Sequence, residues 1–501
     1  MFGPSPAAAP TKRARIIEEA RRLLAADKSA EAAKALEPLV KRPKPDPEGL
    51  FLMALVAERQ HRVDAAVSLA KQSLSLLTHP DPMLLLARYH RSKGETDEGV
   101  AWCDRVLAIK KGVLPAICIK AAALEEAGRY DDAEAVLAPL VAEAEQSGSK
   151  LPAPVREVWA RLLVQRKRFD EALAVIDGIL AEPETPDELR RLVLHLKAKA
   201  CDRAKRYDDA WRAAEGANEI GRIEFDPDLY EEQVSTLMEI WSRENMARFP
   251  LSECDSELPV FVAGMPRSGT SLIDQIIDAH PKAAGVGELN TIERFAGELG
   301  RAYDPSKEPP ACFGKYDRYR WTRVARDYVR ELQDSAGPGV ERVVNKALGN
   351  NKLVGLIARL FPKTRVIHAI RDPKDVSISC FMGGFNNRMH PWTTRVEWAA
   401  RAWEQSMRMM EHWKATLDIP ILDVHYERLV HDPETEFPRI IEFLGLEWDD
   451  ACREFYKSKR TVRTLSYDQV NRPLYTSSAG RHANYDAWLS GVCFPEYAAG
   501  V

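Results

Sequence analysis

Two patterns of hydrophobic and polar positions divide the chain. From about residue 11 to residue 240, apolar residues recur at helical spacing with short polar breaks, which predicts an all-helical region. From residue 259 onwards, short β-prone runs alternate with amphipathic stretches, beginning with Pro259–Ala263 and the stretch after Thr270. This alternation predicts an α/β domain with a parallel, doubly wound sheet. Ligands of such sheets bind beyond the carboxyl ends of the strands.

The helical region contains a repeated phrase. The segments 128–133, 167–172 and 205–210 share a basic residue, an aromatic residue, two acidic residues and an alanine, and 61–66 and 94–99 are weaker copies. The small residue recurs at positions 33, 66, 99, 133, 172 and 210, with Ala33 as the expected first copy. This spacing is close to the tetratricopeptide period of about 34 residues. The region resembles tetratricopeptide repeats, which bury small residues where two helices cross.

Two interpretations of the repeats stay open. Their concave face is either a docking site for an acceptor protein or peptide, or they form a rigid appendage or a homodimer surface. The predicted domains are a disordered tail rich in proline and alanine (residues 1–10), a repeat domain (11–245), a polar linker (246–258) and the α/β domain (259–501).

Composition narrows the choice of partners and compartment. The 501 residues carry a formal net charge of −4, so no basic field points to nucleic acid or an anionic membrane. No apolar run approaches the about 18 residues of a membrane span. The eight cysteines are scattered, without a C-x-x-C pair, which favours reduced thiols in a cytoplasmic protein over disulfides or a zinc site.

The stretch Gly264-Met-Pro-Arg-Ser-Gly-Thr270 is the main candidate for chemistry. A strand, a glycine turn and a helix start place unpaired N–H groups and the positive helix end at one point, which favours an anion. The spacing matches the phosphate loop of nucleotide hydrolases, yet no lysine follows Gly269. Arg267 is the cation instead. The sequence therefore disfavours ATP, a kinase and a metal site.

Four phrases in order along the chain identify a family: Pro266–Leu272, Phe361–Pro373, Tyr426–Val430 and Ser466–Val470. Residues 259 to about 490 resemble the sulfotransferase domain of bacterial tetratricopeptide sulfotransferases and are similar to tyrosylprotein sulfotransferases. The resemblance implies a P-loop-like parallel sheet and a PAPS-dependent sulfotransferase domain over residues 259–501. PAPS, 3'-phosphoadenosine-5'-phosphosulfate, would be the sulfuryl donor, with no metal.

The resemblance also implies roles for individual residues in donor binding. The 5'-phosphosulfate would be held by Arg267, Ser268, Gly269, Thr270 and Ser271. The 3'-phosphate would be held by Arg371 and Ser379, and Arg481 falls where the family places a lysine near it. Further nucleotide contacts would come from Tyr426, Ser466 and Tyr475.

For catalysis, the resemblance implies that Glu288 is the base and that Lys346 acts on the bridging oxygen. Arg267 and Ser466 would share the charge of the transferred group. His280 is a competing base, because cytosolic small-molecule sulfotransferases use histidine.

The sequence departs from the family at two places. Asn345 and residues 347–349 differ from the Asp-Lys-Met-Pro wording of relatives, and Gly383 stands where tyrosylprotein enzymes have an arginine. The predicted function is sulfuryl transfer to a hydroxyl, with tyrosine in a protein or peptide as the favoured acceptor. Small-molecule or polysaccharide sulfation, and a non-catalytic repeat scaffold that binds nucleotide, are the alternatives.

Overall fold

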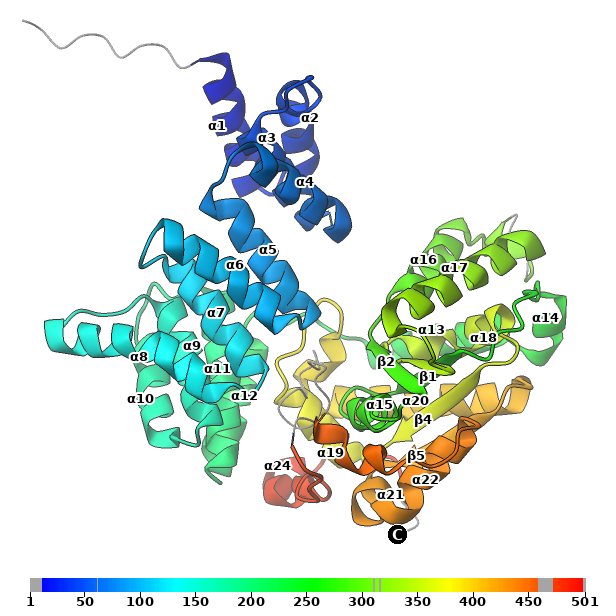
Figure 1. Ribbon diagram of the computed structural model, residues 1–501. Helices are drawn as coiled ribbons and strands as arrows, with labels where there is room; N and C mark the ends of the chain where they lie inside the picture. The colour runs from blue at the N-terminus through cyan, green and yellow to red at the C-terminus, as the bar shows by residue number, and fades with distance from the viewer. Residues whose placement is uncertain (1–10, 61, 310, 315–316, 458–471, 499–501) are drawn as a thin grey trace, which may run out of the picture. The chain divides into compact units, whose positions relative to one another are not determined.

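The computed structural model of the chain describes residues 11–60, 62–309, 311–314, 317–457 and 472–498 (Figure 1). The predicted tail, residues 1–10, and the predicted site residue Ser466 lie outside these ranges. The chain forms two compact units, Met1–Leu162 and Leu163–Val501, which are described one at a time.

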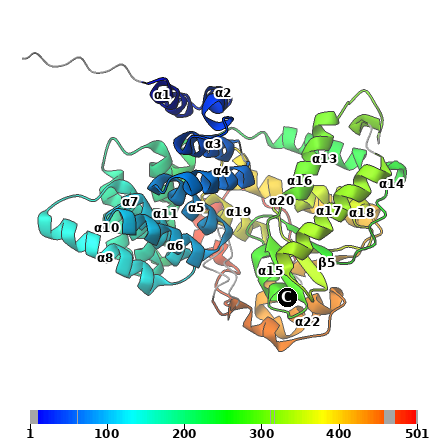
Figure 2. The ribbon, with the colours of Figure 1, turned by 45° about the horizontal axis from the view of Figure 1, so that its top comes forward.

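The first unit consists of helices that pack against their neighbours in sequence (Figure 2). They are α1 (Lys12–Ala25), α2 (Ser29–Val40), α3 (Pro47–Arg59), α4 (Val63–Leu76), α5 (Pro80–Lys93), α6 (Thr96–Ile109), α7 (Leu114–Glu126) and α8 (Tyr130–Ser147), with the division of the two units falling inside α9 (Ala153–Gln165). This arrangement confirms the predicted all-helical repeat region.

Small residues allow close helix contacts in the repeats, as predicted. A Cβ atom on Gly99 of α6 would lie 3.2 Å from the backbone nitrogen of Arg91 in α5, so a larger residue would push the helices apart. The expected first copy, Ala33, is off by one residue. Because α2 has its N-cap at Lys28, the fourth position after the cap is Ala32, which is fully buried, whereas Ala33 is half-buried.

The second unit begins with helices and continues into the sheet. The leading helices are α10 (Phe169–Leu180), α11 (Asp187–Arg203), α12 (Tyr207–Glu219), α13 (Pro227–Ile240) and α14 (Arg243–Arg248). The strands are β1 (Pro259–Gly264), β2 (Ala283–Gly287), β3 (Arg342–Asn345), β4 (Arg365–Ile370) and β5 (Ile421–His425). The later helices are α15 (Thr270–Asp278), α16 (Thr291–Ala302), α17 (Arg318–Ala336), α18 (Asn350–Leu360), α19 (Pro373–Phe381), α20 (Val396–Thr416), α21 (Tyr426–His431), α22 (Pro433–Phe443) and α24 (Asp486–Leu489). Short 3-10 helices are η1 (Ala311–Phe313), η2 (Pro391–Thr394), η3 (Asp450–Lys457) and η4 (Arg481–Tyr485).

The sheet has the strand order β2-β3-β1-β4-β5, and every pair of neighbours is parallel. Side chains alternate between its faces, as the two-residue period of a strand requires. Phe261 packs with α16, α17 and α18, whereas Val260 and Val262 pack with α15, α21 and α22 (Figure 1). This covered parallel sheet confirms the predicted α/β fold, with the carboxyl end of the central strand β1 leading into the anion loop.

The hairpin of α11 and α12 packs on the sheet-bearing part of the second unit. Ala198 and Ala214 share an apolar cluster with Phe381 of α19. The Asn218 side-chain amide donates a 2.7 Å hydrogen bond to the Phe381 carbonyl oxygen. Although α11 and α12 carry the repeat pattern, they therefore belong to the same compact unit as the sheet. The boundaries proposed at residues 245 and 258 stay predictions.

In the described part of the chain, no helix combines the length and the apolar character needed to cross a membrane.

Candidate active site

The loop after β1 is shaped by residues in left-handed backbone conformations. Gly264 has φ +148°, and a Cβ there would lie 2.5 Å from the Ala369 carbonyl oxygen of β4. Gly269 has φ +94°, and its Cβ would lie 2.7 Å from the Tyr426 ring. Arg267 adopts φ +70° although it is not glycine. The chain thus turns sharply, and the N-terminus of α15 faces the pocket, where its dipole and N–H groups favour an anion.

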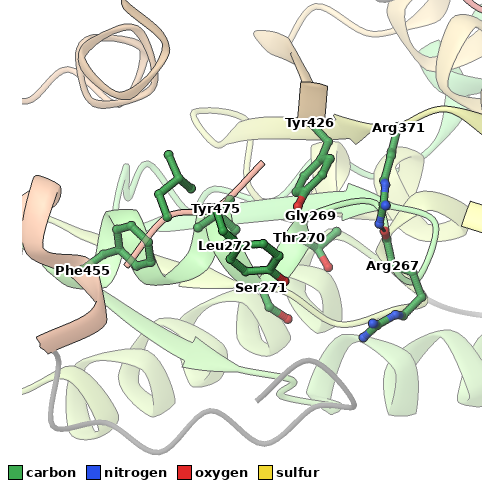
Figure 3. A pocket seen from close by; sticks show the side chains of 10 residues that line it. Arg267, Gly269, Thr270, Ser271, Leu272, Arg371, Tyr426, Phe455 and Tyr475 are labelled. Atoms are coloured by element: carbon green, nitrogen blue, oxygen red, sulfur yellow. Dashed lines mark hydrogen bonds between the residues drawn. The ribbon is translucent and has the colours of Figure 1, made fainter. Parts of the chain in front are cut away.

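A pocket with an empty volume of about 500 Å³ lies on this loop (Figure 3). Its lining consists of Arg267, Gly269, Thr270, Ser271, Leu272, Arg371, Tyr426, Phe455, Leu474 and Tyr475. Figure 3 shows Arg267 and Arg371 at one end and Phe455 at the other. The pocket is therefore cationic at one end and apolar at the other, which suits a ligand with anionic groups and an aromatic base.

Most of the predicted donor-binding residues meet at this pocket. The exceptions include Ser268, which is buried beneath the loop and donates a 2.6 Å hydrogen bond from its hydroxyl to the Met265 carbonyl oxygen. Ser379 of α19 is also buried, and it accepts a 2.8 Å hydrogen bond from Nε of Arg267. These two serines support the loop from behind.

Arg371 is held from several directions. Its guanidinium donates a 2.9 Å hydrogen bond to the carbonyl oxygen of Arg267 and lies 4.5 Å from the centre of the Tyr426 ring. Burial raises the pKa of Tyr426, so its phenol stays protonated at neutral pH. Arg371 is thereby directed toward the anion loop by contacts on both sides.

Glu288 and Lys346 form an ion pair with 2.6 Å between Oε1 and Nζ. Their strands explain the contact, because β2 and β3 pair with Gly287 opposite Asn345, after a register shift between Gly285 and Gly287. Glu288 and Lys346 are each the next residue along the chain. The Lys346 side chain is only 2% exposed, whereas that of Glu288 is 41% exposed and accessible to a second molecule.

Asn345, one of the departures from the family wording, orders the chain around Lys346. Its amide nitrogen donates to the Leu289 carbonyl oxygen at 2.9 Å and to the Tyr328 hydroxyl at 2.8 Å. Its amide oxygen accepts a 2.8 Å hydrogen bond from the Ala347 N–H. An aspartate could not donate the first two bonds, so asparagine suits this environment.

The second departure, Gly383, follows from packing. A Cβ on Gly383 would lie 2.8 Å from both the Ser379 carbonyl oxygen and the Phe385 ring. An arginine therefore does not fit this backbone.

His280 lies at the far end of α15 from the pocket. Its Nδ1 accepts a 3.1 Å hydrogen bond from the Lys282 N–H, and its Nε2 lies 2.8 Å from the Glu447 carbonyl oxygen. The nine residues of α15 separate the two ends by about 13 Å. Backbone groups thus occupy both ring nitrogens of this competing base.

Arg481 does not line the pocket in this structure. It pairs with Asp202 of α11 at 2.9 Å, and Asp202 also accepts a 2.6 Å hydrogen bond from the Tyr485 hydroxyl. Its predicted role near the 3'-phosphate stays a prediction.

Sequence analysis assigned no role to two buried polar residues. Asn350 donates a 3.0 Å hydrogen bond to the Val262 carbonyl oxygen and so ties the chain after Lys346 to β1. Asp375 follows Arg371 by one helical turn and pairs with it at 3.3 Å. The i, i+4 spacing of opposite charges was the available signal for Asp375. Among the described residues, no group of three or more His, Cys, Asp or Glu side chains could hold a metal ion.

The fold and the site define a parallel α/β domain with a phosphate-loop type of anion pocket that has an arginine in place of the usual lysine. Residues 259–450 match the model described as the sulfotransferase family, and residues 17–82 match a tetratricopeptide repeat. The chain thus carries a sulfotransferase-family domain together with tetratricopeptide repeats.

Several known proteins are similar to this chain. An uncharacterized protein of Aquifex aeolicus (strain VF5) is 30% identical over 336 residues, covering 65% of this chain and 44% of that protein. Protein-tyrosine sulfotransferase A of Caenorhabditis elegans is 26% identical over 251 residues, covering 46% of this chain and 60% of that protein. The chain therefore spans about half the length of these relatives. The sulfotransferase domain of the Synechococcus PCC 7002 olefin synthase has a TM-score of 0.36 and 22% identity, covering 50% of this chain and 93% of that structure.

Proposed function

We propose that this protein transfers the sulfuryl group of PAPS to an acceptor hydroxyl. The observation that carries the proposal is the pair of Glu288 and Lys346, which follow neighbouring strands at the sheet edge where the anion loop begins. A carboxylate open to solvent and a buried ammonium group at this edge supply a base and a cation to the same reaction. Sulfuryl transfer needs both.

Donor binding is assigned to the pocket of Figure 3. Arg267 and the N-terminus of α15, with Thr270 and Ser271, would hold the 5'-phosphosulfate. Arg371 and Ser379 would hold the 3'-phosphate, and the wall of Tyr475, Leu474 and Phe455 would cover apolar surface of the nucleoside. The donor set consists of guanidinium, hydroxyl and backbone N–H groups, which suits sulfate and phosphate oxygens and needs no metal.

In the transfer itself, Glu288 takes the proton of the acceptor hydroxyl. The acceptor oxygen forms a bond to sulfur while the bond from sulfur to the 5'-phosphate oxygen breaks. Lys346 neutralises the charge that develops on this departing oxygen, and Arg267 stabilises the equatorial oxygens of the moving group. The products are the sulfate ester, adenosine 3',5'-bisphosphate and the proton on Glu288, which then passes to water.

We favour tyrosine in a protein or peptide as the acceptor. Similarity to protein-tyrosine sulfotransferases supports this choice, as does the exposed carboxylate of Glu288, which a bulky acceptor can reach. The repeats would dock the acceptor or join two copies of the chain, and the protein would work in the cytoplasm without nucleic acid or membrane. The competing functions are sulfation of small molecules or polysaccharides, and a scaffold that binds nucleotide without catalysis.

The test is to incubate the full chain with ³⁵S-labelled PAPS and separate acceptors: tyrosine-containing peptides, small phenols and polysaccharide. The proposal expects label on peptide tyrosine and an equal amount of adenosine 3',5'-bisphosphate. Label only on phenols or polysaccharide would replace the acceptor, and nucleotide binding without transfer to any acceptor would favour the scaffold. The Glu288→Gln variant is the control for transfer without the base.

A further inference from the structure

A buried carboxylate of α19 connects the base of the pocket to its wall. The Asp375 side chain is fully buried. It pairs with the Arg371 guanidinium at 3.3 Å and accepts backbone hydrogen bonds of 2.8 Å from Gly480 and from His482. The His482 ring also lies 3.1 Å from it, through Nδ1. One carboxylate therefore joins Arg371 to a segment about 105 residues further along the chain.

The segment that Asp375 holds forms one wall of the pocket. It runs from Leu474 and Tyr475, which line the pocket, to the backbone groups bound by Asp375. Arg371 adds a hydrogen bond to the carbonyl oxygen of Ser478 in the same segment. Asp375 and Arg371 thus fasten this wall together.

Helix capping does not account for Asp375. The N-cap of α19 is Asp372, whose Oδ1 accepts hydrogen bonds from the backbone N–H groups of Lys374 and Asp375 at 2.8 and 3.2 Å. The side chain of Asp375 is directed to groups outside its own helix, apart from Arg371.

Charge does not account for Asp375 either. A negative charge next to Arg371 offsets part of the attraction that this arginine exerts on an anionic ligand. A buried carboxylate in an anion pocket is therefore useful only through geometry. It fixes the direction of the guanidinium and the place of the wall.

We propose that Asp375 is a positioning residue of the donor site, which orients Arg371 toward the 3'-phosphate and holds residues 478–482 so that Tyr475 covers the nucleotide. This inference rests on the proposed function for the identity of the ligand. It goes beyond that function because it gives a role to a residue that does not line the pocket.

The experiment compares the full chain with its Asp375→Asn variant, using calorimetry with adenosine 3',5'-bisphosphate and with adenosine 5'-phosphate. Asparagine keeps the size of the side chain but loses the charge-assisted bonds, so affinity for the bisphosphate should fall by about ten- to a hundredfold. Affinity for the 5'-phosphate should fall less, so preference for the 3'-phosphate should narrow. The control is Asp317→Asn, which alters a carboxylate that caps α17 by accepting a 2.9 Å hydrogen bond from the Arg320 N–H. It should change neither affinity.

Unchanged or tighter bisphosphate binding in Asp375→Asn would overturn the proposal, since it would mean that only the charge mattered. An equal loss for both nucleotides would also overturn it, because a merely structural role lowers both alike. If Asp375→Asn does not fold, His482→Ala removes one of its partners and should narrow the preference in the same direction, whereas an unaltered preference would contradict the role. Failure of the wild-type chain to bind the bisphosphate would instead refute the proposed function.

Discussion

Nζ of Lys346 lies 2.6 Å from Oε1 of Glu288, although the two residues are 58 positions apart in the chain. Neither strand alone places them together. The contact depends on the register shift in β2, which sets Gly287 opposite Asn345 and makes both charged residues emerge at the same edge. The ion pair stabilises the candidate base in a defined position before an acceptor arrives.

Replacing Glu288 with glutamine should lower turnover by roughly two to four orders of magnitude, the usual contribution of a general base. Affinity for adenosine 3',5'-bisphosphate should barely change, because Glu288 does not line the donor pocket. Steady-state sulfuryl transfer and calorimetry measure the two effects. Glu293→Gln, five positions further on, is the matched control and should keep its activity. If Glu288→Gln works at the wild-type rate while His280→Ala is inactive, the base is the histidine.

The hairpin of α11 and α12 should be necessary for a stable sheet domain. A fragment of residues 246–501 would expose Ile378 and Phe381 of α19, which the hairpin covers. It would also lose the bond from Asn218 to the Phe381 carbonyl oxygen. We expect this fragment to melt at a lower temperature than residues 163–501, or to aggregate. Equal melting temperatures by circular dichroism would show that the hairpin is dispensable.

Acid should destabilise the fold through Asp423. Burial alone would raise its pKa, but bonds from His368 at 2.9 Å and Lys414 at 2.5 Å hold the pKa at about 2. The unfolded value is about 3.9, so the carboxylate stabilises the folded chain above that pH and the contribution disappears as pH falls toward 2. Denaturation at a series of pH values should show a shallower loss between about pH 4 and 2 in Asp423→Asn. An identical slope in both proteins would contradict the assignment.

Nucleotide binding should not depend on a divalent metal. The cations of the pocket are Arg267 and Arg371, so adenosine 3',5'-bisphosphate has partners for its phosphates without magnesium. Calorimetry with and without EDTA should give the same affinity, and ATP should bind more weakly. Strict magnesium dependence or a preference for ATP would count against a sulfotransferase.

The sequence by itself determined the repeats, the anion loop and four of the strands. Their signals are local: helical periodicity, the glycines at 264 and 269, and short β-prone runs. Strand β2 was not predicted, because Ala-Ala-Gly-Val-Gly has little β-propensity and becomes a strand only by pairing with β3. The tertiary structure alone decided that Arg267 meets Ser379 across 112 positions, and that Asp375 binds the distant segment at His482. Such contacts depend on strand register and helix packing, which bring together residues whose local patterns carry no information about each other.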